Sequence, residues 1–112
     1  MLGRKRVRKS LSVEELGLNL GSISESDLEE LAAEASERLA SALDELVGRQ
    51  SYYVSTVRLE FDEERRAINA IIEVEVSSPI QPSPELITSI DSIIDECFEV
   101  IRNELIRKFK SS

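Results

Sequence analysis

The amino-acid sequence predicts an α+β protein of two layers, in which two helices pack on one face of an antiparallel β-hairpin. Two long segments, one in each half of the chain, repeat apolar residues at helical spacing. Between them, two shorter segments alternate apolar and polar residues, as half-buried strands do. With 112 residues the chain has the length of one domain, and we predict an α-β-β-α domain over residues 26–112.

The first predicted helix begins at Ser26. The residues Ser26-Asp27-Leu28-Glu29 have the spacing of a capping box, in which the serine hydroxyl and the glutamate carboxylate bind free amides of the first turn. Apolar residues then recur every three or four positions up to Leu46. Gly48 is expected to end the helix, because glycine readily adopts the left-handed conformation found at helix C-termini.

Two strands are predicted next, over residues 51–61 and 67–76. The charged residues 62–66 between them are expected to form the turn of a hairpin. One face of this hairpin is apolar, and it comprises Tyr53, Val57, Leu59 and Phe61 of the first strand and Ile68, Ala70, Ile72, Val74 and Val76 of the second.

The second predicted helix begins at Pro84 and runs almost to the end of the chain. Three prolines exclude regular structure over residues 77–83, and Ser83 is suited to cap the helix that follows. The apolar stripe of this helix comprises Leu86, Ile90, Ile93, Ile94, Cys97, Phe98, Ile101 and Leu105. We expect this stripe to pack on the hairpin beside the first helix.

The N-terminal segment differs from the rest in charge. The chain has a net charge of -8, yet residues 1–10 contain five Lys or Arg and no Asp or Glu. We predict that residues 1–25 form a flexible basic arm and connector. Five cations lie in it, namely Arg4, Lys5, Arg6, Arg8 and Lys9. They can contact nucleic-acid phosphates or the ribosome, act as a solvated tail that aids solubility, dock on an acidic partner or on the protein's own body, or serve as an address signal. The acidic remainder of the chain would itself repel a phosphate backbone.

A second group of residues predicts association between chains. A two-stranded sheet has two unpaired edges and is marginally stable alone. In addition, some apolar residues fall outside the stripe of the second helix or on the open face of the hairpin. We predict that the protein forms a homodimer, which extends the sheet or pairs the helices, or binds another protein subunit, through Ile71, Ile87, Val100, Ile106 and Phe109.

Several classes of function are disfavoured. Because the chain has no His and its one cysteine, Cys97, lies on the predicted core stripe, it offers no Cys/His or Ser/His/Asp nucleophile. Glu73 and Glu75 form a pair of carboxylates, which is more typical of a solvated strand face than of a metal site. The glycines match no phosphate-binding loop. We therefore predict no catalytic residue, cofactor, metal or small-molecule substrate.

No apolar run is long enough to cross a membrane, and the lone cysteine fits a reducing compartment, so we expect a cytoplasmic protein. The expected function is a non-enzymatic module for protein–protein interaction or assembly. The alternative is an RNA-associated accessory protein in tRNA or ribosome maturation that contacts phosphates through the basic arm.

Three segments carry a resemblance to a known family: LEELAAEASERLASAL, INAIIEVEVSSP and SIDSIIDECFEVIRNEL. Over residues 26–107 the chain resembles an archaeal family of unknown function, domain of unknown function 3194. This resemblance implies an archaeal source and no catalytic residue, and the charged composition would fit a thermophile. Genes of that family lie beside those of a prefoldin subunit and of the small dimerising subunit of the KEOPS complex, which implies work in protein assembly or RNA maturation.

Overall fold

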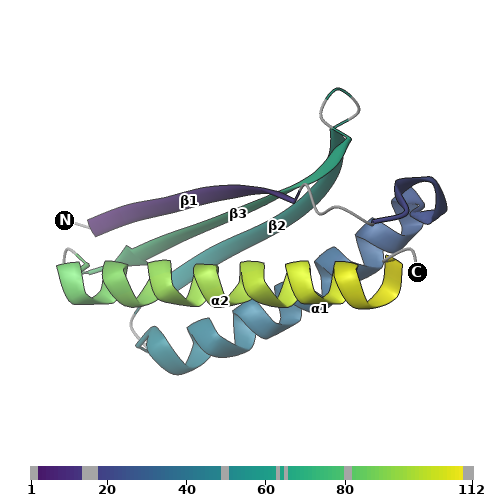
Figure 1. Ribbon diagram of the computed structural model, residues 1–112. Helices are drawn as coiled ribbons and strands as arrows, with labels where there is room; N and C mark the ends of the chain where they lie inside the picture. The colour runs from purple at the N-terminus through teal and green to yellow at the C-terminus, as the bar shows by residue number, and fades with distance from the viewer. Residues whose placement is uncertain are drawn as a thin grey trace.

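The computed structural model describes residues 3–13, 18–48, 51–62, 64, 66–79 and 82–109 (Figure 1). Within these residues the elements are, in order, β1 (Gly3–Val13), the short 3-10 helix η1 (Leu20–Ser22), α1 (Glu25–Leu46), β2 (Tyr52–Asp62), β3 (Ala67–Ser78) and α2 (Pro84–Phe109). The strands form one antiparallel sheet in the order β1-β3-β2. Both helices cover the same face of this sheet (Figure 1), so the predicted α+β class is confirmed.

The strand β1 corrects the prediction of a flexible arm. Residues 3–13 pair with β3 along their whole length, from Gly3 opposite Ser78 to Val13 opposite Ile68. The physical reason is an alternation of side chains, because Val7, Leu11 and Val13 pack against the core while the even-numbered residues between them are exposed. The sheet therefore has three strands within one chain, and β1 belongs to the same folded unit as the helices. The rest of the predicted arm, residues 1, 2 and 14–17, lies outside the described residues.

The hairpin of β2 and β3 has its apolar side chains on the predicted face. Val57 lies opposite Ile72 and Leu59 lies opposite Ala70. The even-numbered residues of β3 from Ile68 to Val76 are completely buried under the helices, whereas the odd-numbered ones lie on the open face. The predicted turn is confirmed at its end by Arg66, whose φ of 54° is a left-handed conformation used in tight turns.

The helix α1 begins earlier than predicted. Its N-cap is Ser24, whose hydroxyl accepts a hydrogen bond from the amide of Asp27 at 3.1 Å, while the Asp27 carboxylate accepts one from the Ser24 amide at 2.8 Å. The predicted box at Ser26 is therefore wrong. Starting at Ser24 places Ile23 just before the cap and Leu28 in the first turn, and both are buried in the core, as in a hydrophobic staple. An N-cap at Ser26 would have placed a glutamate at the position of Ile23.

The second helix begins as predicted. The Ser83 hydroxyl accepts a hydrogen bond from the amide of Leu86 at 3.1 Å, which satisfies one of the free donors of the first turn.

One core lies between the helices and the sheet. Helix α1 packs on β2, and α2 packs on β1 and β3. The inside residues of all four elements belong to a single cluster, which includes Leu39 and Leu43 of α1, Val57 and Leu59 of β2, Ile72 and Val74 of β3, and Ile94 and Phe98 of α2. Three surfaces lie outside this core and are open to a partner: the open sheet face, the two sheet edges, and the outer side of the helix layer.

Candidate functional site

The open face of the sheet carries a row of arginines beside a row of glutamates. Arg6 lies opposite Glu75 and Arg8 lies opposite Glu73 in the register of β1 and β3. The Arg4 Nε is 3.2 Å from Glu75 Oε1, the Arg6 Nε is 3.1 Å from Glu73 Oε1, and the Arg6 Nη2 is 3.0 Å from Glu75 Oε2. The hydrogen bond with Glu75, assisted by the charges of both glutamates, raises the pKa of Arg6 above its usual value. The arginines are thus held on the protein's own carboxylates.

The predicted cationic cluster is divided between two faces of β1. Lys9 points towards the helix layer, where its Nζ is 2.6 Å from Asp95 Oδ1 and 3.2 Å from Asp91 Oδ1. The hydrogen bond to Asp95 is the main reason why the pKa of Lys9 is raised. Lys5 shares the strand parity of Lys9 and is exposed. Of the alternatives considered for these cations, the structure shows contact with the protein's own body for Arg4, Arg6, Arg8 and Lys9.

The two edges of the sheet differ in charge. The β1 edge has five cations in residues 4–9, and such charges protect an edge strand from pairing with another chain. The β2 edge has no charged residue from Tyr52 to Val57. On its open face Tyr52 is 76% exposed and Val54 is 68% exposed, and they are the exposed large hydrophobic residues of the described chain. No other strand in the described residues pairs with this side of β2.

The strand β2 is fixed to the helix layer by Tyr53. The Tyr53 hydroxyl donates its one proton to a pair of acceptors in α1, the carboxylate of Asp44 and, at 3.1 Å, the carbonyl of Ala40. The hydrogen bond to Asp44, together with burial, raises the pKa of Tyr53. The neighbouring side chains of Tyr52 and Val54 therefore project from a strand whose other face is anchored.

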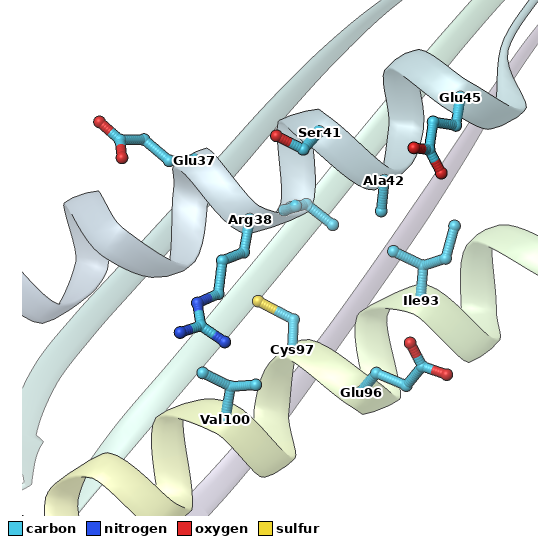
Figure 2. Close-up of a pocket in the computed structure, with 10 residues that line it drawn as sticks. Glu37, Arg38, Ser41, Ala42, Glu45, Ile93, Glu96, Cys97 and Val100 are labelled. Atoms are coloured by element: carbon cyan, nitrogen blue, oxygen red, sulfur yellow. The ribbon is translucent and has the colours of Figure 1, made fainter.

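A groove of about 560 Å³ runs between the two helices (Figure 2). Its apolar part comprises Leu39 and Ala42 of α1 and Ile93, Cys97 and Val100 of α2. Glu45 of α1 and Glu96 of α2 lie at its rim, Glu37 of α1 points away from it, and Arg38 extends across it towards Val100 (Figure 2).

Cys97 lies in the floor of this groove. Its side chain is 6% exposed, and its thiol lies 3.7 Å from the carbonyl of Ala35, to which it donates. Burial raises the pKa of the Cys97 thiol, while the positive charge of Arg38 acts in the opposite direction. The thiol therefore stays protonated at neutral pH and lacks the thiolate character of a catalytic cysteine.

The helix layer as a whole is acidic. Helices α1 and α2 together contain 14 Asp or Glu and four Lys or Arg, a net charge of -10. The three strands contain six Lys or Arg and four Asp or Glu, a net charge of +2. The carboxylates at the groove thus belong to a layer with a net negative charge, whereas the sheet on the other side of the molecule has a net positive charge.

The predicted interface residues lie in different places. Val100 is half-buried in the wall of the groove, and Ile71 is half-buried on the open sheet face. Ile87 and Phe109 pack against the core, and Ile106 is half-buried on α2. The structure therefore does not bring these five residues together in one patch. The sequence analysis predicted neither the groove nor the uncharged stretch of β2. The run YYVSTV, which contains no charged residue, was a signal for the uncharged stretch.

Two further observations concern the described residues. They contain no group of three or more Cys, Asp or Glu side chains arranged to hold a metal ion. Neither helix of the described chain is long and apolar enough to span a membrane.

Comparison with known proteins identifies a fold and no activity. A crystal structure of a protein from Thermococcus onnurineus NA1 is similar to this chain with a TM-score of 0.61. The two chains are 20% identical, and the similarity covers 96% of this chain and 94% of the other. At this identity the likeness concerns the fold alone. No protein-family model and no curated protein sequence matches the chain, so the resemblance to the archaeal family stays a prediction.

Proposed function

We propose that the chain is a non-enzymatic interaction module that forms a homodimer through the edge of β2. Antiparallel pairing of two β2 strands across a twofold axis would join the two sheets into one of six strands. The observation that carries this proposal is the uncharged edge from Tyr52 to Val57, with the side chains of Tyr52 and Val54 largely exposed beside it. The proposed place of action is the cytoplasm, which the free thiol of Cys97 supports.

The contrast between the edges supports a second copy as the partner of β2. Antiparallel pairing of two β1 strands about Arg6 would bring Arg4 opposite Arg8 of the second copy, and like charges directly opposite are destabilising. Pairing of two β2 strands about Val54 brings only uncharged residues opposite one another over residues 52–57, and pairing about Ser55 does so over residues 53–57. It also covers part of the exposed apolar surface of Tyr52 and Val54 with side chains of the second strand, which gives a hydrophobic gain.

The proposal is tested by the mass of the protein in solution. Size-exclusion chromatography with light scattering at micromolar concentrations should give twice the mass of the chain. Val54→Lys should give the mass of one chain, because it places two ammonium groups close together in the paired edges. The matched control is Ser10→Lys, which adds the same charge on the open face at the opposite edge of the sheet.

Circular dichroism of both variants should match that of the wild type, which separates a broken interface from a broken fold. A monomeric wild-type protein would refute the homodimer. A dimer that persists in Val54→Lys would refute the role of the β2 edge.

The RNA-associated alternative has weaker support. Arg4, Arg6 and Arg8 remain largely exposed, which favours contact with a phosphate backbone. Glu73 and Glu75 lie within the same row of side chains, however, and their charges oppose that contact.

A further inference from the structure

We propose that the groove between α1 and α2 binds a basic amphipathic helix of a partner protein. This inference depends on the proposed role as an interaction module and names the chemistry of its partner. The groove offers apolar side chains from both helices, among them Ala42, Ile93 and Val100, to the apolar side of such a helix (Figure 2). Apolar anchors that enter a groove between helices are a recurrent mode of peptide recognition.

The charges at the groove select the sign of the partner. Glu45 lies on one side and Glu96 on the other, so Lys or Arg residues that flank an apolar stripe would meet a carboxylate on each side, whereas Glu37 points away from the groove (Figure 2). Arg38, which also lines the groove, opposes a cation at its own end of it. The surrounding helix layer, with its net charge of -10, attracts a cationic segment from a distance and increases its rate of association.

The same charges exclude other occupants. A second copy that presented its own helix layer would bring carboxylates against carboxylates. Nucleic acid and anionic membrane surfaces would be repelled for the same reason. A cationic protein segment is the class that remains.

The length of the groove sets the length of the partner segment. From Glu37 to Glu45 the helix α1 rises about 12 Å, which corresponds to about two turns. A partner helix would therefore fill it with apolar residues at positions i, i+3, i+4 and i+7 and place its cations on both flanks.

The probe for this test is a synthetic 18-residue peptide with Leu at those positions and Lys elsewhere. Isothermal titration calorimetry should show binding of one peptide per chain. A peptide of the same composition with the Leu positions scrambled keeps the charge and loses the apolar stripe. It should bind at least about tenfold more weakly, because a difference of this size corresponds to the burial of one or two apolar side chains.

A matched pair of variants locates the site. Glu96→Lys reverses a charge at the rim of the groove, and Glu99→Lys makes the same change on an exposed residue of α2 outside it. Glu96→Lys should weaken binding at least about fivefold more than Glu99→Lys. A charge at the rim acts directly on the nearest cation of the peptide, in addition to its share in the negative potential of the helix layer. NMR shifts on adding the peptide should concentrate at Ala42, Ile93 and Val100.

The monomeric variant Val54→Lys separates the two proposals, because the β2 edge and the groove are on different elements. It should bind the Leu/Lys peptide as the wild type does. Peptide binding by a wild-type protein that proves monomeric would leave the groove in place and refute only the dimer. Equal binding of the ordered and scrambled peptides, or equal effects of Glu96→Lys and Glu99→Lys, would show general attraction to an acidic surface and overturn the inference.

Discussion

Arg6 of β1 lies opposite Glu75 of β3, and its Nη2 is 3.0 Å from the Oε2 of that carboxylate. A second carboxylate oxygen, Glu73 Oε1, lies 3.1 Å from its Nε, so one guanidinium bridges two glutamates of the central strand. The most basic segment of the chain thus lies on one of the few acidic stretches of the sheet. The ion pairs that hold the edge strand β1 on β3 therefore also neutralise part of the positive charge that a partner would meet on the open face.

Removing the glutamates should release the arginines for other anions. We expect the double variant Glu73→Gln, Glu75→Gln to bind a single-stranded RNA more tightly than the wild type at low salt, with an affinity that falls steeply as salt is added. Its thermal stability should fall only slightly, because exposed ion pairs contribute little. Fluorescence anisotropy with a labelled RNA and a thermal melt measure these two effects.

The control for that variant is Glu29→Gln, Glu30→Gln on α1, which changes the net charge equally and leaves the open face intact. Equal gains in RNA binding by both double variants would show that net charge alone matters. Tight binding by the wild type, lost on Arg6→Gln, would favour the RNA-associated alternative.

The sequence contained the signal for β1, but its charge concealed it. Val7, Leu11 and Val13 share one strand parity, which is the period of a half-buried strand, and Lys9 interrupts it. Five cations in such a segment suggest a solvated tail, because an isolated strand of this kind would not be stable. The carboxylates that compensate these charges, Glu73 and Asp95 among them, lie more than 60 residues away in the chain. The pattern of residues within a segment cannot show that carboxylates far away in the chain neutralise its charges.

The N-cap of α1 provides a direct test of the corrected helix start. Ser24→Ala removes the acceptor for the Asp27 amide and should lower the free energy of unfolding by about 1 kcal/mol. Ser26→Ala changes the same residue type two positions later, at an exposed site inside the first turn, and should have little effect. Urea denaturation of the two variants checks this. A larger loss for Ser26→Ala would indicate that Ser26 is the N-cap of α1, as predicted from the sequence.

The candidate surfaces were less predictable than the core. The periodicity of β3 and α2 identified Ile72, Ile94 and Phe98 as inside residues, because burial on one face follows directly from the spacing of apolar side chains. The groove depends on how far α1 and α2 lie apart, which neither helix encodes by itself. Val100 was predicted as an interface residue and lies in that groove, whereas Phe109 packs on the core.

The two neighbouring isoleucines of β3 test the register of the sheet. Ile72 is completely buried, and Ile72→Ala should cost about 2 to 5 kcal/mol of unfolding free energy, as large-to-small changes in a core do. Ile71 is half-buried on the open face, so Ile71→Ala should cost well under half as much. Chemical denaturation followed by circular dichroism measures both. A comparable loss at Ile71 with dissociation of a dimer would instead place an interface on the open sheet face.

The thiol of Cys97 should make the protein less stable in alkaline solution. Burial raises its pKa in the folded state, so the folded protein holds the thiol proton more tightly than the unfolded chain does. This contribution to stability is complete below the pKa of the unfolded thiol, about 8.5, and is lost as the pH rises from there through the higher folded value. Tyr53, whose pKa is also raised, should act in the same direction at still higher pH.

The variant Cys97→Ala lowers stability by a constant amount through the lost packing, and it also removes this thiol from the titration. Urea denaturation between pH 7 and about pH 9.5 should therefore show a steeper decline for the wild type than for Cys97→Ala. Parallel declines would mean that the thiol ionises equally in both states, and that the floor of the groove is open to water.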